Sequence, residues 1–255
     1  ELRGRSVAGV DVMQPKCLNV PPREFEQLVT GTSVGHVTSR GKWIFMELKP
    51  GTTLLINLGM GGELLYHRKG ELLPANRQAA LLFTDGSAQS QHFWWFGYVH
   101  AVKTAQLASH AMTARLGLDP LKDSSFTSEA FDQMLQRKKR GAIKNVLLDQ
   151  QNIAGIGNVY VQDILFAARL HPLRRTGDLS QAERAALYQA ILTQLQSALA
   201  LGGLAYEKDL YNQPGRLKDF QIGYRQGKLC PVCGTPVEKI RTGSTASFIC
   251  PHCQT

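Results

Sequence analysis

The chain has 255 residues, of which 43 % are hydrophobic, and it carries a formal net charge of +9. This length allows two modest domains or one large one, and the composition excludes a disordered chain. No apolar run approaches the roughly 20 residues of a membrane helix, so we expect no membrane partner. The excess of positive charge favours a polyanionic partner such as nucleic acid.

Short apolar runs alternate with turns in the first part of the chain. Residues 7–66 combine period-two alternation with β-branched and aromatic residues, a pattern typical of strands. A hairpin is predicted at Asp85-Gly86, because Asp-Gly pairs favour two-residue turns. We therefore expect an all-β unit in residues 1–105, a sandwich or a barrel. The chain opens at Glu1 rather than at Met, and we expect its natural N-terminus to lie upstream.

Helical patterns follow the β unit. Residues 124–135 have N-cap candidates followed by helical spacing, and residues 143–150 and 157–170 also have helical spacing. The clearest helix is predicted between Ser180, as its N-cap, and the Gly202-Gly203 pair that ends it. Glu183 stands at the third position of this helix, as in a capping box. Residues 204–228 are polar and rich in turn residues, so we expect a loop there.

Four of the five cysteines form two C-x2-C pairs near the end of the chain, Cys230 with Cys233 and Cys250 with Cys253. This spacing predicts one Zn²⁺ ion held by four thiolates, with two short strands between the pairs. The alternatives are two disulfides or free thiols. Because four protein ligands leave no position for water, we expect the zinc to be structural. Cys17 stands alone, and we expect it to be a small buried hydrophobic residue.

A basic stretch and a glycine-rich turn lie close together in the helical part. RKKRGAIK, residues 137–144, contains five cations in eight residues, and AGIGNVY places Gly155 and Gly157 just before a predicted helix. Such a turn presents backbone N–H groups at a helix N-terminus, where anions bind. The sequence therefore predicts a phosphate site near Asn158. The alternative for the charge run is a solvated helix face.

Residues 143–175, IKNVLLDQQNIAGIGNVYVQDILFAARLHPLRR, resemble the helix-two-turn-helix module of the formamidopyrimidine-DNA glycosylase/endonuclease VIII family. The cysteine pairs resemble its zinc finger, and RGKWIFMEL, LLINLGMGGELL and RLGLDPL match its pattern in the right order. The resemblance implies an α+β multidomain fold, in an atypical member. Its predicted parts are an N-terminal β-sandwich (1–105), a helical helix-two-turn-helix domain with a lesion-capping loop (106–222) and a C-terminal zinc-finger β-hairpin (223–255).

Members of this family excise oxidised bases from damaged double-stranded DNA and then cleave the strand. The resemblance thus implies a base-excision-repair DNA glycosylase with abasic-site (AP) lyase activity. In the family an N-terminal proline amine attacks the sugar C1′ and forms an iminium that promotes elimination. The family's opening Pro-Glu segment and first helix would precede Glu1, so we expect the nucleophile upstream of this chain. Lys42 matches a lysine that assists elimination and contacts phosphate; its alternative is a strand-edge lysine.

The resemblance also implies DNA contacts. Asn158 matches the phosphate-binding asparagine, and Arg140 and Lys144 belong to the basic stretch before it. Met60 matches the residue that fills the space left by a flipped base; its alternative is a core methionine. The predicted lesion-capping loop contains two tyrosines that either stack on an extruded base or pack the loop down, Tyr206 and Tyr211.

Two positions depart from the family pattern. WWFG, residues 94–97, stands where formamidopyrimidine-type members carry RRFG, whose arginine reads the base opposite the lesion. We expect Trp95 and Phe96 to contact DNA and at least one of the aromatics Trp94, Trp95 and Phe96 to lie in the core. An aromatic side chain that faces DNA here would stack or wedge without hydrogen-bond readout. The zinc-finger arginine of the family is Thr245 here, and Arg241 is the nearest cation.

Three hypotheses for function follow. The first is the glycosylase with AP lyase activity, and the second is a non-catalytic DNA-binding relative without the nucleophile. A zinc-ribbon translation or transcription factor, the third, leaves the glycine turn and the β unit unexplained. A Pro-Glu start encoded before Glu1 would favour the enzyme over the binding protein. We expect a monomer in the cytoplasm of bacterial type, associated with the nucleoid, since clustered cysteines fit a reducing compartment.

Overall fold

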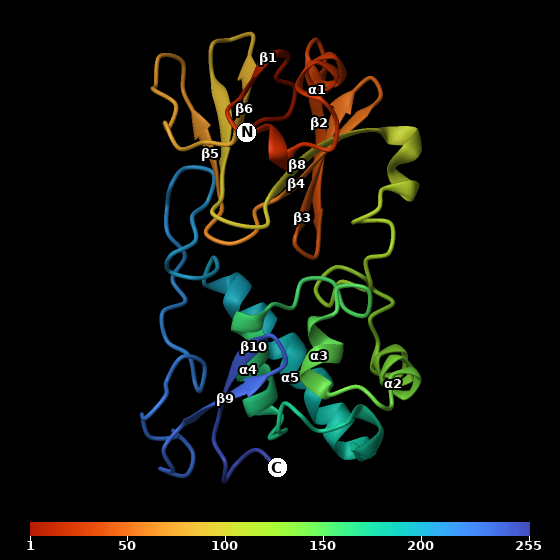
Figure 1. The fold of residues 1–255 in the computed structure, drawn as a ribbon, viewed down its shortest axis with the longest axis vertical. Coiled ribbons are helices and arrows are strands. Elements are labelled where there is room, and N and C mark those ends of the chain that lie inside the picture. The colour runs from red at the N-terminus through yellow and green to blue at the C-terminus, as the bar shows by residue number, and fades with distance from the viewer. The chain divides into compact units, whose positions relative to one another are not determined.

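The computed structural model describes residues 1–255 and divides them into two compact units (Figure 1). The first unit combines Glu1–Arg115 with Gly202–Arg216, and the second combines Leu116–Leu201 with Leu217–Thr255. None of the helices is both long and apolar enough to cross a lipid bilayer.

The first unit contains two four-stranded antiparallel sheets, as the alternating sequence pattern predicts. One sheet has the strand order β1-β6-β7-β5 and the other has the order β2-β3-β4-β8. The strands are β1 (Val7–Val12), β2 (Ser33–Arg40), β3 (Trp43–Lys49), β4 (Thr52–Asn57), β5 (Glu63–His67), β6 (Ala79–Phe83), β7 (Ala88–His92) and β8 (Tyr98–Lys103). The predicted hairpin at Asp85-Gly86 joins β6 to β7, with Gly86 at φ +83°.

Apolar side chains from both sheets meet in one core, which makes this unit a β-sandwich. Leu81 of one sheet and Leu54 of the other belong to the same buried cluster. The prediction of an all-β unit missed helix α1 (Pro22–Val29), which buries Phe25 and Val29 in that core. Proline at the helix start and apolar residues four positions apart are helical signals. Cys17 is buried in the same cluster, as predicted.

The second unit is built from α2 (Ser128–Arg137), α3 (Ile143–Leu148), α4 (Asn158–Ala167) and α5 (Gln181–Ala200). Short 3-10 helices lie at Pro15–Cys17, Thr104–Ser109 and Thr176–Asp178 across the chain. The predicted capping box at the start of α5 is confirmed: the Glu183 N–H donates to the Ser180 hydroxyl, and the Ser180 N–H donates to the Glu183 carboxylate. Gly202 at φ +70° follows the helix end.

The cysteine pairs flank a two-stranded antiparallel hairpin, β9 (Glu238–Thr242) and β10 (Thr245–Ile249), as the spacing predicts. The turn between the strands contains Gly243 at φ +66°. Phe248 of β10 packs with Phe166 of α4 and with Cys250 in a small cluster. The hairpin is therefore anchored to the helices of the second unit by apolar contacts.

Residues 202–216 pack on the first unit, although the predicted boundaries assign this loop to the helical domain. The Tyr66 N–H donates to the Leu210 carbonyl at 2.8 Å. Lys208 forms an ion pair with Glu63, with 2.8 Å between Nζ and Oε1. These contacts attach the loop to strand β5.

Candidate functional site

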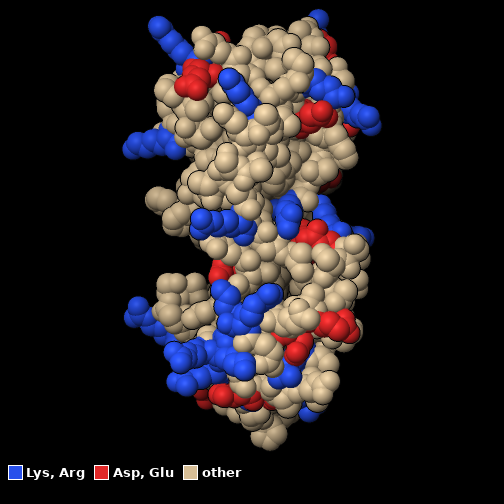
Figure 2. All heavy atoms as spheres, turned by 90° about the vertical axis from the view of Figure 1, so that its right-hand side faces the viewer, with Lys and Arg blue, Asp and Glu red and all other residues tan.

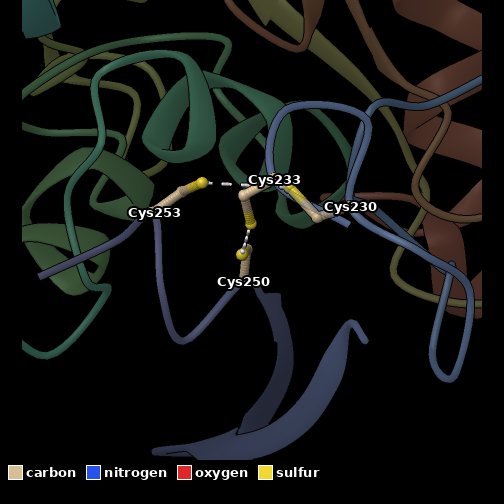
Figure 3. A group of neighbouring side chains, drawn as sticks. All are labelled: Cys230, Cys233, Cys250 and Cys253. Carbon is tan, nitrogen blue, oxygen red and sulfur yellow. Dashed lines mark hydrogen bonds between the residues drawn. The ribbon is translucent and has the colours of Figure 1, made fainter. Parts of the chain in front are cut away.

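The four paired cysteines converge at the base of the hairpin, where their sulfur atoms all lie within 4.8 Å of one another (Figure 3). The Sγ atoms of Cys230 and Cys253 are 3.9 Å apart, and those of Cys233 and Cys250 are 3.4 Å apart. A tetrahedron with Zn–S bonds of about 2.3 Å has sulfur–sulfur edges of about 3.8 Å. A disulfide would need about 2.05 Å. The geometry fits one structural Zn²⁺ ion and excludes the disulfide alternative.

The four thiols have different surroundings in the absence of the metal. Hydrogen bonds with Thr235 lower the pKa of the Cys233 thiol to about 6, whereas desolvation raises the pKa values of Cys250 and Cys253. The Val232 N–H points at the Cys230 sulfur at 3.4 Å, and Gly234, directly after Cys233, takes φ +76°. A tight turn of this kind lets two sulfurs reach one ion.

Lys144, which the sequence places on the DNA surface, is buried in the second unit with only 1 % of its surface exposed. Its ammonium donates to the hydroxyls of Thr242, Thr245 and Ser247 and to the Ala246 carbonyl, at 2.7 to 2.9 Å. Burial lowers the pKa of this ammonium to about 8. The Lys144 nitrogen is therefore enclosed by protein oxygens, unlike an exposed phosphate-binding lysine. Its role is to fasten α3 to the hairpin.

The N-terminus of α4 is fixed to the same hairpin by a side chain that the sequence analysis missed. Gln162 donates to the Asn158 carbonyl at 2.9 Å and to its side-chain oxygen at 3.2 Å. The Gln162 side-chain oxygen accepts from the Phe248 N–H at 3.1 Å. Gly157 is the N-cap residue and offers no side chain to the first helical N–H groups. The half-buried Asn158 amide thus lies at an uncapped helix start, as the phosphate-site prediction requires.

A second buried polar residue of α4 was also missed. The Asp163 carboxylate accepts from the backbone N–H groups of Gln221, Ile222 and Gly223, at 2.7 to 3.0 Å. It thereby holds the segment that leads into the zinc ribbon. The signal was present in the sequence, because the polar pair Gln162-Asp163 interrupts an otherwise apolar helix.

The remaining predicted cations differ from Lys144 in their exposure. Arg140 follows the end of α2, and Arg241 lies on β9; both are exposed. The Arg241 guanidinium donates to the Gly243 carbonyl at 3.3 Å, which places it along the hairpin turn. Thr245 is half-buried, and its hydroxyl accepts from Lys144. Lys and Arg side chains gather over the second unit on the face shown in Figure 2.

Lys42 lies in the turn between β2 and β3, after Gly41 at φ +54°. It is exposed, and desolvation by nearby protein lowers the pKa of its ammonium. The next residue, Trp43, is buried and stacks on Tyr98 with 6.0 Å between ring centroids. This packing anchors the turn that carries Lys42.

The stretch WWFG meets the loop that carries Met60 at the end of the sandwich. The Met60 N–H donates to the Trp95 carbonyl and the Trp94 N–H donates to the Met60 carbonyl, both at 2.9 Å. Met60, Trp94, Trp95 and Phe96 are 58 %, 68 %, 67 % and 74 % exposed. The expectation that one of the three aromatics lies in the core is wrong, and so is the alternative of a core methionine. Backbone pairing of the two loops turns all four side chains outward.

The two tyrosines of the predicted capping loop lie in different surroundings. The Tyr211 hydroxyl donates to the Glu1 carboxylate at 2.8 Å, and its ring meets the edge of Tyr66 at 6.5 Å. This contact raises the pKa of Tyr211. Tyr211 therefore packs the loop against the first unit, whereas Tyr206 is 64 % exposed.

A β-sandwich unit, a helical unit with a glycine turn and a four-cysteine ribbon define a helix-two-turn-helix protein with a zinc finger. Comparisons of sequence support each part. Residues 1–94 match the formamidopyrimidine-DNA glycosylase N-terminal domain, residues 116–209 match the formamidopyrimidine-DNA glycosylase H2TH domain, and residues 227–255 match the zinc finger found in FPG and IleRS.

Relatives match along the whole chain. Formamidopyrimidine-DNA glycosylase of Gluconobacter oxydans is 34 % identical over 98 % of this chain and 93 % of its own length. The enzyme of the same name from Chloroflexus aggregans is 36 % identical over 100 % of this chain and 93 % of its own length. The chain belongs to the formamidopyrimidine-DNA glycosylase family.

Solved structures share the fold. Lactococcus lactis Fpg (MutM) in complex with DNA that contains N7-benzyl-Fapy-dG superposes with a TM-score of 0.90 at 24 % identity, over 100 % of this chain and 94 % of that one. A complex of Lactococcus lactis Fpg with DNA that contains an abasic site gives a TM-score of 0.89 at the same identity and coverage. The predicted sandwich, helical and zinc-finger architecture is confirmed.

Proposed function

We propose that this protein is a base-excision-repair DNA glycosylase that excises oxidised bases from duplex DNA and also acts as an AP lyase at the abasic site that results. The observation that carries the proposal is the match, over nearly the whole chain, to relatives named formamidopyrimidine-DNA glycosylase. Two structural features also support the proposal: the four-cysteine centre, and exposed side chains on both units that are available for contact with DNA. As its relatives are bacterial, we place it in the bacterial cytoplasm, and we propose that it acts as a monomer.

The phosphate contacts in this proposal come from exposed cations and from one helix start. Arg140 and Arg241 are exposed on the second unit, and Asn158 lies at the uncapped start of α4. Cations that replace counterions along the backbone supply most of the affinity for DNA. An amide and the backbone N–H groups of a helix start add hydrogen bonds to a phosphate at a fixed position. Thr245 retains a hydroxyl that can donate, but its oxygen already accepts from Lys144.

The lyase step needs an amine that attacks the sugar C1′. A C–N bond forms at C1′ as the base leaves and the amine loses its proton, and the C1′–O4′ bond then breaks with protonation of O4′ to open the sugar ring; the resulting iminium makes the neighbouring C2′ proton acidic. Loss of this proton expels the 3′ phosphate. In this proposal the nucleophile is an N-terminal proline amine upstream of residue 1, and Lys42 assists elimination. Desolvation lowers the pKa of Lys42, which is the direction that favours a role in proton transfer.

Trapping by borohydride tests the chemistry, because the reagent reduces the iminium to a permanent protein–DNA cross-link. The natural protein, if it begins with Pro-Glu, should cross-link to duplex DNA that contains an abasic site, and the chain that starts at Glu1 should cross-link far less. In the full-length protein, Lys42→Ala should leave cross-linking intact but slow strand cleavage by roughly 10²-fold. Lys16→Ala, at another exposed lysine, is the matched control.

The outcomes separate the parts of the proposal. Equal cross-linking by both forms that disappears in Lys42→Ala would make Lys42 the nucleophile. Base excision without cross-linking or strand cleavage would leave a glycosylase and remove the lyase. Absence of excision from every oxidised duplex would contradict the proposal as a whole.

A further inference from the structure

Two histidines of the first unit are joined by a hydrogen bond. His100 lies on β8, and His110 follows the 3-10 helix Thr104–Ser109 that comes after this strand. The His100 Nδ1 and the His110 Nε2 are 2.9 Å apart, and the His110 Nδ1 lies 2.9 Å from the Thr113 hydroxyl oxygen. His100 and Thr113 are buried. The two rings and the hydroxyl therefore form one continuous hydrogen-bonded chain.

Both imidazole rings pack on Trp43, the residue that directly follows Lys42. The centroid of the Trp43 ring lies 5.9 Å from that of His100 and 5.8 Å from that of His110. Tyr98 of β8 stacks on Trp43 and also meets the His100 ring at 5.3 Å. Aromatic pairs in such arrangements add to the stability that burial alone provides. The turn between β2 and β3 is thus held, through Trp43, against the segment that follows β8.

The contact between the two histidines has room for only one proton. One nitrogen must carry the hydrogen and donate it, and the other must accept. The bond is kept when both rings are neutral, and also when one ring takes up a proton on a nitrogen outside the contact. When both rings are protonated, every ring nitrogen carries a hydrogen, so the contact loses its acceptor and two positive charges face each other. The hydrogen bond therefore breaks in acid.

The surroundings of the pair favour its neutral state. Desolvation and, after it, the charge of His110 lower the pKa of His100 to about 4, and desolvation lowers the pKa of His110. Tyr98 is the titratable neighbour in ring contact with His100. The other charged or titratable side chains of β2, β3, β8, the β2–β3 turn and the segment up to residue 115 contribute nothing to these shifts: His36, Arg40, Lys42, Glu47, Lys49, Lys103 and Arg115. At neutral pH the pair is therefore uncharged and its hydrogen bond is formed.

We propose that His100 and His110 are positioning residues for Lys42, whose turn their shared hydrogen bond holds in place through Trp43. The inference rests on the proposed function, in which Lys42 assists elimination. The histidines themselves touch neither DNA nor the reacting atoms, and they act only through the packing of Trp43. Strand cleavage consequently depends on the protonation of the pair: when both rings are protonated, the bond breaks and the turn is released.

Variants of His110 in the full-length protein separate the hydrogen bond from the ring. With excess enzyme and a duplex that contains a preformed abasic site, borohydride cross-linking reports the iminium and strand cleavage reports elimination. His110→Phe keeps a ring against Trp43 and removes both nitrogens, so cleavage should slow roughly tenfold while cross-linking stays unchanged. His110→Gln keeps an amide that can bond to His100, so its cleavage rate at neutral pH should match that of the wild type. His36→Phe, at an exposed histidine of the same sheet, is the control and should change neither step.

A double variant tests whether His110 acts through Lys42. If it does, Lys42→Ala/His110→Phe should cleave no more slowly than Lys42→Ala alone, because the group that His110 positions is already gone. The pH dependence gives a second signature that a purely structural role would not produce. Between pH 6.5 and about 4, the cleavage rate of the wild type should fall relative to that of His110→Gln, whose amide does not titrate.

Nuclear magnetic resonance detects the hydrogen bond itself, without DNA and without any chemical step. The His100 Nδ1 and the His110 Nε2 should show a nitrogen–nitrogen scalar coupling across the bond at neutral pH. This coupling should be absent in His110→Phe, and in the wild type it should disappear in acid as both rings become protonated. His36→Phe should leave it unchanged.

The possible results are distinct. A missing coupling at neutral pH, or a further tenfold loss in the double variant, would overturn the inference while leaving the glycosylase proposal intact. Cleavage by His110→Gln as slow as that by His110→Phe would show that the hydrogen bond does not position the turn. Thermal unfolding checks the fold of each variant, and the comparison of the wild type with His110→Gln across pH decides the inference even if His110→Phe does not fold. If the wild type neither excises a base nor cleaves the strand at any pH, the proposed function fails and the inference fails with it.

Discussion

The exposed apolar side chains of Met60, Trp94, Trp95 and Phe96, here called the aromatic tip of the first unit, and the hairpin of the second unit are built in opposite ways. At the tip, backbone hydrogen bonds and close-packed glycines turn apolar side chains into solvent. At the hairpin, a buried ammonium and a buried amide hold the backbone, while Asn158 and Arg241 remain accessible. The difference teaches that residue type alone does not decide burial: the tip's tryptophans face out, whereas Lys144 of the basic stretch faces in.

Removal of zinc should have the largest effect. It should unfold the hairpin and leave the aromatic tip unchanged. Without the metal, the four cysteine side chains lose the ion that holds them together, and small zinc ribbons then lose their fold. We expect hydrogen exchange at β9 and β10 to become fast after treatment with a chelator, while β3 and β4 stay protected. DNA affinity should fall at least about tenfold if the hairpin contributes even one charged contact. Full protection of β9 and β10 in metal-free protein would show that the ribbon folds without zinc.

Lys144→Met should destabilise the second unit without altering its electrostatic contacts with DNA. The substitution keeps a long apolar stem but leaves the Ala246 carbonyl and buried hydroxyls without their donor. We expect a loss of about 2–4 kcal/mol in the free energy of unfolding, measured by denaturant titration. The salt dependence of DNA binding should stay unchanged. Lys139→Met, at an exposed position, is the control; a smaller loss at Lys144 than at Lys139 would contradict the structure.

The pH dependence of the free energy of unfolding tests the burial of Lys144. The pKa of Lys144 is about 8 in the folded protein, against 10.5 in an ordinary lysine, so the folded state loses this proton first as pH rises. Between these values the unfolded chain holds more protons, and the free energy of unfolding therefore increases with pH. Relative to Lys144→Met, the wild type should gain at most about 3 kcal/mol between pH 8 and 10.5. A constant difference over this window would mean that the ammonium is not penalised by burial.

The smallest expected effect concerns a single exposed cation. If Arg140 neutralises one phosphate, Arg140→Ala should reduce the slope of log affinity against log salt by about 0.9. Lys144→Met should leave that slope as it is, which makes the two variants a matched pair. The slope is obtained from the DNA affinity of each variant at several salt concentrations. A slope that changes in Lys144→Met but not in Arg140→Ala would reverse the assignment made from burial.

Local patterns allowed most of the architecture to be predicted. The capping box at Ser180 and the paired cysteines depend on neighbours a few residues apart, and both have the expected geometry. Lys144 shows the limit, because its hydrogen-bond partners lie 98 to 103 residues away in sequence. A lysine in a basic stretch has no local signal for burial. Similarly, aromatic residues are usually buried, and only the pairing of two distant loops turns Trp94 and Trp95 outward.

The glycine frame of the aromatic tip also bears on how this protein can evolve. Gly59, Gly61 and Gly97 set the backbone, and any side chain there would collide with its surroundings. The outward residues meet no such restriction, because most of their surface lies in solvent. Mutation can therefore exchange the tip's side chains at little cost in folding, while the scaffold that presents them tolerates almost no change.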